Sequence, residues 1–410
     1  MNTQVNVVGL GYIGLPTALM LAAHRVNIVG TDCNEHIVET LRRGSLTFTE
    51  PGMEQLFRAA HDGQILFTTE YAKTDFYIIS VPTPYHKETK KINTGYLRSA
   101  VESVLAVCEK DAVVVIESTV SPGTIDRCVR PMLMKHGRGD VRLAHAPERI
   151  LPGNMIREMV RNDRTIGADS ADVGERVKAI YASFCQGEIV VTDIRTAEMT
   201  KVVENAYRDV NIAFANELTK ICRAGGMDVH EIIRIANRHP RVNILEPGPG
   251  VGGHCIPVDP WFLVGDFPEE ARLIRRARDI NDSMPRFVLE RVRAIMREHG
   301  LTDFSHVGFY GIAYKENVND TRESPTLQLM EQLAQGQEPL PKSYDPLCGR
   351  VVCAGQCNAF EPFLEAIDVL VVMVAHSHLK ENWDKVRNKF VLDTRHCGLE
   401  PSCGNTIIYL

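Results

Sequence analysis

Gly9-Leu10-Gly11-Tyr12-Ile13-Gly14 is the stretch that decides the fold of the first part of this chain. It follows a short apolar run, Val5 to Val8, and opens a helical pattern from Gly14 to His24. A second β-branched run, Val26 to Gly30, ends just before Asp32. Strand, glycine turn, helix and strand in this order predict a βαβ unit within a parallel sheet.

The glycine turn also predicts a ligand. Its glycines let the backbone approach a diphosphate at the start of a helix, where unpaired N–H groups and the helix dipole favour anions. An aspartate at the end of the next strand accepts hydrogen bonds from a ribose and repels a 2′-phosphate, so the pattern predicts NAD rather than NADP. The alternative is a tight turn with an incidental aspartate. The residues assigned to this cofactor site are Gly9, Gly11, Tyr12, Ile13, Gly14 and Asp32.

Three more buried strands are expected in the same sheet, over residues 75–80, 112–117 and 141–144. The first two are followed by hydroxyl-rich turns, Ser80-Val-Pro-Thr-Pro84 and Glu117-Ser-Thr-Val-Ser-Pro-Gly123. The carboxyl ends of parallel strands form the binding edge of such a sheet. We therefore expect Thr83, Ser118 and Thr119 to line the cofactor site, with simple capped turns as the alternative.

The rest of the chain predicts a helical connector and a second α/β unit. Long helical patterns cover residues 192–224 and 270–299, and strand patterns return at residues 306–311, 340–344, 366–375 and 390–394, with a helix at 324–334. The fold class is thus α/β, with two doubly wound, Rossmann-like parallel-sheet domains joined by a helical connector. The expected domains are residues 1–191, 192–299 and 300–410.

Composition excludes several classes of protein. The net charge of −6 over 410 residues is spread along the chain, so no nucleic-acid surface is expected. The longest later apolar run, Val369 to Ala375, is too short to cross a membrane. Eleven cysteines lie without framework spacing, which is typical of reduced thiols. We expect a cytoplasmic protein, with no membrane or nucleic-acid partner and no metal.

A loop rich in glycine and proline interrupts the helical connector at residues 247–260. Within it, Cys255 follows two glycines and a histidine, and Asp259 lies four residues later. A cysteine in such a loop is open to a close-approaching substrate, and nearby backbone N–H groups can stabilise a thiolate or an oxyanion. A buried structural cysteine is the alternative, because cysteine is often simply buried.

Two further groups of polar residues fit an active site. Glu198, Lys201 and Asn205 have helical spacing, and an ammonium beside an amide can stabilise an alkoxide, although a solvated helix face is the simpler reading. Lys315 and Arg322 lie between a strand and a helix, a place suited to a diphosphate.

With these residues assembled, the chain resembles the UDP-glucose/GDP-mannose dehydrogenase family over nearly its whole length. The resemblance rests on five motifs in order: GLGYIGLP with Asp32, ESTVSPGT, ENAYRDVNIAFANEL, GPGVGGHCIPVDP and GIAYKENVNDTRESP. Within the family, the cysteine loop and the segment around Glu148 are most similar to those of bacterial UDP-N-acetyl-D-mannosamine dehydrogenases. The second glutamate of the UDP-glucose enzymes has no counterpart at Leu151-Pro152-Gly153, so its role is not transferred.

The resemblance implies a four-electron oxidation of a UDP-sugar at C6 with NAD, through a thiohemiacetal and a thioester on Cys255, for polysaccharide biosynthesis. Lys201 and Asn205 would stabilise oxyanions, Asp259 and Thr119 would position water, and Glu148 would act as general base. It also implies a homodimer, in which Arg241 reaches the site of the neighbouring subunit. The implied substrate contacts are Glu148, Arg149, Lys201, Asn205, Arg241, Gly252 and Lys315, and Arg322 would lie on the cofactor side.

Other readings stay open at this point. The sugar could be that of UDP-N-acetylglucosamine or UDP-glucose. A two-electron β-hydroxyacid dehydrogenase would share the first domain and a helical lysine, but it needs neither the Cys255 loop nor a second α/β domain. A non-catalytic sensor of NAD or nucleotide sugars is the remote alternative, and the presence of Cys255, Lys201, Asn205 and Asp259 argues against it.

Overall fold

The computed structural model describes residues 4–62, 65–336 and 339–410 of the chain. The chain divides into two compact units, and each is described by itself. Unit 1 contains residues 1–204 and 261–268, and unit 2 contains residues 205–260 and 269–410. Two helices, α8 (Ile194–Gly225) and α10 (Asp259–Asp266), contribute residues to both units.

Unit 1 is built on an eight-stranded sheet with the strand order β3-β2-β1-β4-β5-β6-β7-β8. The order reverses between β1 and β4, and in open sheets of this kind ligands bind at the carboxyl ends of the strands beside that reversal. The strands are β1 (Gln4–Val8), β2 (Asn27–Thr31), β3 (Leu66–Thr68), β4 (Phe76–Ile79), β5 (Val113–Ile116), β6 (Arg142–His145), β7 (Arg164–Ala168) and β8 (Ile189–Thr192).

The side chains of the central strands alternate between two helical layers. In β5, Val113 and Val115 pack into the core that α1, α3 and α7 cover, whereas Val114 and Ile116 pack into the core that α4 and α5 cover. A sheet that is apolar on both faces is the reason for the continuous β-branched runs in the sequence. The helices of unit 1 are α1 (Gly14–Ala23), α2 (Glu35–Arg42), α3 (Met53–Asp62), α4 (Gly95–Val107), α5 (Arg130–Lys135), α6 (Met155–Arg161) and α7 (Ala171–Tyr181), with a π-helical turn at Ile125–Val129.

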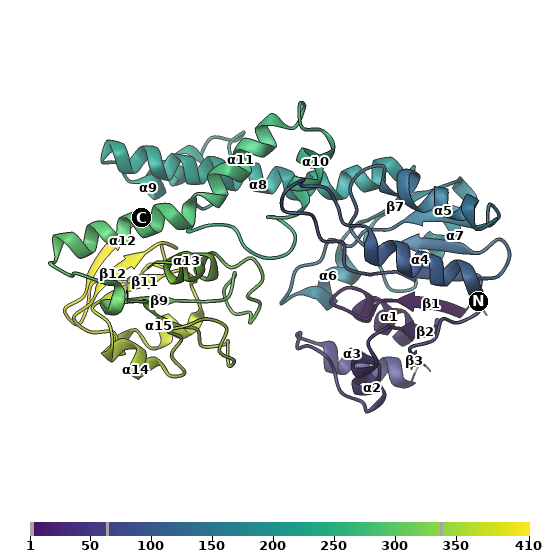
Figure 1. Ribbon diagram of the computed structural model, residues 1–410, viewed down its shortest axis with the longest axis horizontal. Helices are drawn as coiled ribbons and strands as arrows, with labels where there is room; N and C mark the ends of the chain where they lie inside the picture. The colour runs from purple at the N-terminus through teal and green to yellow at the C-terminus, as the bar shows by residue number, and fades with distance from the viewer. Residues whose placement is uncertain (1–3, 63–64, 337–338) are drawn as a thin grey trace. The chain divides into compact units, whose positions relative to one another are not determined.

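Unit 2 contains a second, fully parallel sheet with the order β10-β9-β11-β12-β13. Helices α12 and α13 cover one face of it, and α14 and α15 cover the other (Figure 1). Its strands are β9 (Val307–Tyr310), β10 (Lys342–Tyr344), β11 (Val369–Val372), β12 (Phe390–Asp393) and β13 (Thr406–Tyr409). Its helices are α9 (Val229–Ala236), α11 (Arg272–Asp282), α12 (Met284–Glu298), α13 (Pro325–Ala334), α14 (Phe360–Glu365) and α15 (Ser377–Glu381), with 3-10 turns at Phe304–His306 and Trp383–Lys385.

The predicted fold class is confirmed, with three local differences. The helix expected over residues 270–299 is two helices, α11 and α12, because Pro285 lacks an N–H and is accommodated only in a first turn. The strand expected over 366–375 is only β11, since α14 and its end occupy the preceding residues. In unit 1, β6 and β7 pair antiparallel, so the sheet is not parallel throughout.

Among the described residues, no helix combines the length and the apolar character that a membrane span requires.

Candidate functional site

The glycine turn between β1 and α1 has the geometry that its sequence predicts. Gly9 adopts a φ of 91°, and a Cβ atom there would lie 2.3 Å from the carbonyl oxygen of Ser80. A Cβ on Gly14 would lie 1.9 Å from the carbonyl oxygen of Gly9. By contrast, a Cβ on Gly11 would meet no described atom within 4 Å, so this glycine leaves open space above the turn. A diphosphate can therefore approach the start of α1 without meeting a side chain.

Asp32, directly after β2, is tied to this turn. Its Oδ2 accepts the N–H of Leu10 at 2.8 Å, and its Oδ1 accepts the N–H of Asn34 at 2.8 Å. The carboxylate is partly exposed, and each oxygen keeps a lone pair for a ribose hydroxyl. Beside the turn, Tyr12 stacks on Phe48 with ring centroids 4.2 Å apart. These residues fit NAD, whose adenosine ribose carries no 2′-phosphate.

The loops after β4 and β5 are bound to each other by their hydroxyls. Ser118 Oγ donates to the carbonyl of Val81 at 2.7 Å and accepts the N–H of Val81 at 2.8 Å. Thr83 Oγ1 donates to the carbonyl of Thr119 at 2.6 Å. The structure thus brings these predicted residues together at the sheet edge that carries the glycine turn, and the Ser118 and Thr83 hydroxyls fix the loops.

Helix α8 has a buried polar side. Glu198, Lys201 and Asn205 are all buried, which excludes a solvated helix face for them. Glu198 accepts the N–H groups of Gly123 and Ile125, at 2.5 and 2.9 Å, and so ties α8 to the loop after β5. Burial raises the pKa of Glu198 to about 7 although these bonds lower it. Lys201 follows one helical turn later, on the same side of α8.

The cysteine loop lies in unit 2 and packs against the segment that carries Lys315 and Arg322. A Cβ on Gly252 would lie 2.5 Å from Cβ of Tyr314, and one on Gly253 would lie 2.9 Å from the Tyr314 ring. The N–H of Gly253 donates to the carbonyl of Arg322 at 2.9 Å. This close packing explains the paired glycines, and it leaves Cys255 partly exposed.

A turn joins Cys255 to helix α10. The carbonyl of Cys255 accepts the N–H groups of Val258 and Asp259, at 3.1 and 2.9 Å. The buried Asp259 accepts a hydrogen bond from Asn205 Nδ2 at 2.6 Å. The loop that carries the thiol is therefore fixed to α8 through the two polar residues that were expected beside it.

Glu148, the expected general base, is not an isolated carboxylate. It follows β6, it is buried, and its Oε1 accepts the N–H of Arg149 at 2.8 Å. Its Oε2 accepts a hydrogen bond from Arg164, which is itself buried. Arg164 has no sequence signal, because its position at the start of a strand, after Asn162-Asp163, does not indicate that its side chain is buried.

The remaining predicted residues are in different surroundings. Arg149 forms ion pairs with Glu204, at 2.9 Å, and donates to Thr165 Oγ1 at 3.0 Å. Arg322 forms an ion pair with Asp320, and Arg241 is exposed in the loop after α9. Unit 1 holds the glycine turn, Asp32, Thr83, Ser118, Thr119, Glu148, Arg149 and Lys201, and unit 2 holds Asn205, Arg241, Gly252, Cys255, Asp259, Lys315 and Arg322.

A buried hydrogen-bond network, which sequence reasoning missed, holds the loop that carries Lys315. Asp345, after β10, accepts the N–H groups of Ile312 and Ala313, at 2.7 and 2.8 Å, and contacts His376 Nε2 at 3.2 Å. Since His376 Nδ1 accepts the N–H of Asn317 at 3.0 Å, its Nε2 carries the proton. Burial alone would raise the pKa of Asp345, but these donors hold it at about 2. The carboxylate thus stays charged and anchors the loop.

All eleven cysteines are free thiols in the structure. In the three described ranges, no group of three or more histidine, cysteine or acidic side chains is arranged to hold a metal ion.

With this geometry described, the chain can be compared with known proteins. Three domains of the UDP-glucose/GDP-mannose dehydrogenase family match it: the NAD binding domain over residues 3–185, the central domain over 195–283 and the UDP binding domain over 308–398. A UDP-N-acetyl-D-mannosamine dehydrogenase of Salmonella typhi is 41% identical over 96% of this chain and 98% of its own length. An NDP-N-acetyl-D-galactosaminuronic acid dehydrogenase of Ralstonia nicotianae is 42% identical over 95% of each chain.

A solved structure supports the same relationship. The UDP-D-ManNAc dehydrogenase of Pyrococcus horikoshii superposes with a TM-score of 0.91 at 35% identity, over 99% of this chain and 98% of the other. Full-length identity and fold agree with the ordered motifs and with the cofactor turn. The chain therefore belongs to the UDP-glucose/GDP-mannose dehydrogenase family.

Proposed function

We propose that this NAD-dependent UDP-sugar dehydrogenase oxidises the C6 primary alcohol of a UDP-N-acetylhexosamine to a carboxylate, with UDP-N-acetyl-D-mannosamine as substrate. The observation that carries the proposal is the cysteine loop. Cys255 is partly exposed between paired glycines and a turn, and four residues later Asp259 is hydrogen-bonded to Asn205. A simple alcohol dehydrogenase has no need of a nucleophile held in this way.

The first oxidation converts the alcohol to an aldehyde, and the second needs a tetrahedral carbon. Attack of the Cys255 thiolate on the aldehyde gives a thiohemiacetal, its oxidation leaves a thioester, and water then releases the carboxylic acid and the free thiol. Lys201 and Asn205 stabilise the oxyanions of the alkoxide and of the thiohemiacetal. Glu148 takes the proton of the attacking water, and Thr119 and Asp259 position that water. NAD supplies the hydride acceptor for both oxidations.

NAD and the UDP-sugar are bound by different groups of residues. The glycine turn and Asp32 hold the adenosine diphosphate part of NAD, because this turn admits a diphosphate and both Asp32 oxygens retain lone pairs. Lys315 and Arg149 contact the UDP-sugar, and Arg322 lies on the cofactor side. The Asp345 network that fixes residues 312–317 keeps Lys315 on a rigid loop.

The choice of sugar rests on the relatives. These relatives are dehydrogenases of N-acetylated amino sugars, named for mannosamine in one group and for galactosaminuronic acid in another. The acetamido group is shared, and the configuration of the sugar differs between the groups. UDP-N-acetylmannosamine is therefore the first substrate to test, followed by UDP-N-acetylgalactosamine, UDP-N-acetylglucosamine and UDP-glucose.

The decisive experiment counts NADH. A limiting amount of each UDP-sugar is consumed completely, and the NADH formed is measured by absorbance. Two NADH per sugar are expected, because both oxidations occur before product leaves. One NADH per sugar, with aldehyde as the product, would contradict the proposal.

A cysteine variant tests the covalent step. Cys255→Ser should bind both ligands and lose net acid formation, whereas Cys403→Ser, an exposed cysteine near the end of the chain, should behave like the unmodified protein. Unchanged steady-state turnover in Cys255→Ser would rule out the thioester.

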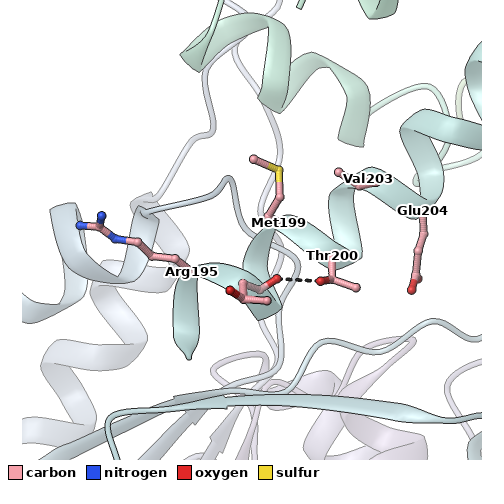
Figure 2. Close-up of a pocket in the computed structure, with 6 residues that line it drawn as sticks. Arg195, Met199, Thr200, Val203 and Glu204 are labelled. Atoms are coloured by element: carbon pink, nitrogen blue, oxygen red, sulfur yellow. Dashed lines mark hydrogen bonds between the residues drawn. The ribbon is translucent and has the colours of Figure 1, made fainter. Parts of the chain in front are cut away.

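The proposal includes a homodimer formed through helix α8. Five large apolar residues of α8 are exposed on one side of it: Met199, Val203, Tyr207, Phe214 and Ile221. Their spacing of four and seven residues places them opposite the buried Lys201 and Asn205. A shallow pocket lies on the same side of α8, and its lining includes Met199, Val203 and Glu204 (Figure 2). A second copy of α8 would cover it, and Arg241 would then reach the partner's site.

A further inference from the structure

Behind the loops at the sheet edge of unit 1 lies a buried group of charged and polar side chains. Its members come from separate elements: Thr17 on α1, Glu117 at the end of β5, Glu148 after β6, Arg164 on β7 and Tyr181 on α7. Glu117 is 1% exposed and Arg164 is 4% exposed. Buried charges are costly unless they are paired, so the way in which these groups share charge determines their properties.

Within this cluster, Arg164 lies against two carboxylates, those of Glu148 and Glu117. Its Nη2 is bonded to Glu148 Oε2, and its Nη1 lies 3.8 Å from Glu117 Oε1. That Nη1 is buried and has no hydrogen-bond partner among the described residues. The guanidinium carbon lies 4.2 Å from the centre of the Tyr181 ring. Arg164 is thus hydrogen-bonded to Glu148 through Nη2 and lies beyond hydrogen-bond distance of Glu117.

Glu117 has hydroxyl partners instead. Thr17 Oγ1 lies 3.1 Å from both of its carboxylate oxygens, and the Tyr181 hydroxyl lies 3.0 Å from Oε1. Burial raises the pKa of Glu117 to about 7. The positive charge of Arg164 lowers this pKa, and the neighbouring Glu148 raises it further. Glu117 therefore carries a proton below about pH 7.

The other groups around Glu117 do not titrate in the same range. Burial and the adjacent Glu117 raise the pKa of Tyr181 well above its ordinary value, so its hydroxyl stays neutral. His145 on β6 pairs in register with Ile116, the residue before Glu117, and burial lowers its pKa to about 4. Near neutral pH, the charge of the cluster is therefore set by Glu117.

We propose that Arg164 and Glu117 are positioning residues for Glu148: Arg164 orients the Glu148 carboxylate, and Glu117 competes with Glu148 for the same guanidinium. With Glu117 protonated, the cluster is neutral and Arg164 is committed to Glu148. When Glu117 releases its proton to solvent, the cluster carries one net negative charge. Arg164 is then attracted to both carboxylates and binds Glu148 less strongly. The inference rests on the proposed role of Glu148 as the base of thioester hydrolysis.

A less strongly held Glu148 beside a second negative charge is a stronger base, so hydrolysis should accelerate as Glu117 ionises. The hydride steps do not involve Glu148 and should be unaffected. Thr17, in the first turn of the helix that begins at the cofactor turn, links the same cluster to the NAD site.

The test uses the full-length enzyme with NAD and its UDP-sugar, and it separates the fast formation of NADH from the release of acid over a range from about pH 6 to about pH 9. In the unmodified enzyme, acid release should rise severalfold with an inflection near pH 7, the range in which Glu117 titrates. Glu117→Gln should keep the NADH burst and lose the inflection. Superimposable pH profiles for the two proteins would overturn the inference.

Tyr181→Phe is the matched variant, because it keeps the ring under Arg164 and removes one hydroxyl from Glu117. That hydroxyl lowers the pKa of Glu117, so its loss should move the inflection to higher pH without abolishing it. A merely structural role for Tyr181 would change stability and leave the inflection in place, which would also contradict the inference.

Arg164→Lys tests whether the Arg164 guanidinium orients Glu148. It keeps the positive charge and loses the planar guanidinium that orients the Glu148 carboxylate. A base that points away from the attacking water cannot take its proton, so acid release should slow at least about tenfold while the acyl-enzyme accumulates in intact-mass spectra. Equal slowing of burst and release would overturn the positioning role. An unmodified enzyme that makes no NADH with any UDP-sugar would instead overturn the proposed function, so the two failures are distinguishable.

Discussion

Asp32 is hydrogen-bonded to the glycine turn in the structure and is the proposed ribose ligand, and a substitution tests the second role. Its oxygens accept the N–H groups of Leu10 and Asn34, and they are placed to accept ribose hydroxyls as well. Asp32→Ala should weaken NAD binding at least about tenfold, which corresponds to about 1.4 kcal/mol, and should reduce the discrimination against NADP. Fluorescence titrations with NADH and NADPH measure both effects.

Asp32→Asn is the control for this prediction, because it keeps an oxygen acceptor and removes the charge that repels a 2′-phosphate. It should improve NADPH binding relative to NADH with a smaller loss of NADH affinity. If NADH affinity in Asp32→Ala were unaltered, the assignment of the ribose site would be wrong.

Glu117 should also make stability depend on pH. Its pKa rises from 4.5 to about 7 on folding, so between these values the folded state binds more protons than the unfolded state. The resulting stabilisation is complete below pH 4.5 and is lost as the pH rises through about 7. Glu117→Gln, which resembles the protonated form, should therefore gain stability relative to the unmodified protein between pH 5 and pH 8, by on the order of 3 kcal/mol.

Urea unfolding of both proteins at several pH values gives this difference directly. His145, whose pKa is lowered by burial to about 4, contributes in the opposite direction, but it is present in both proteins and cancels. A stability difference that does not change with pH would show that Glu117 is ionised throughout.

At the scale of elements, helix α8 is held by polar contacts as well as by apolar packing. The buried Arg278 of α11 donates to Asp209 of α8 at 2.6 Å, and Asn281 donates to the same oxygen at 2.8 Å. Asn216 of α8 continues the network by accepting the N–H of Gly248, at 2.9 Å, at the start of the cysteine loop. The network therefore connects the packing of two helices with the position of the cysteine loop.

Arg278→Met should destabilise the protein by about 3 to 5 kcal/mol, because it leaves the carboxylate of Asp209 buried without its cation. Arg276→Met is the matched control on the same helix: the Arg276 side chain is 82% exposed and should contribute nothing measurable. Thermal and urea unfolding compare the two variants. Equal stability of both would mean that water replaces the guanidinium in the network.

At the scale of the whole molecule, the exposed side of α8 should control assembly and activity together. Phe214→Glu puts a charge in the centre of the apolar stripe and should yield a monomer in multi-angle light scattering. Activity should fall with dimer content, because Arg241 would no longer reach a partner's site. Leu273→Glu, which alters an apolar residue of α11 that is 69% exposed, should remain dimeric. A Phe214→Glu protein that stays dimeric would place the interface elsewhere.

The sequence predicted much of this molecule because several of its features are local. The glycine turn, the alternation of apolar residues in the strands and the glycine–proline loop around Cys255 each constrain backbone geometry over a few residues. Such constraints predict the fold class, the NAD site and the membership of a family. They also predicted the helical spacing of Lys201 and Asn205, although not that this side of α8 is buried.

Tertiary structure alone decided which charged groups meet. Arg164 is one of many arginines in the sequence, and only the pairing of β6 with β7 and the packing of α7 bring it to Glu148, Glu117 and Tyr181. The same holds for Asp345 and His376, which lie 31 residues apart and fix the loop of Lys315. Backbone turns follow from local sterics, whereas the protonation of a buried carboxylate depends on charges brought from distant parts of the chain. The sequence by itself therefore determined the fold class and the family, and the fold decided how the charges of the buried groups are shared.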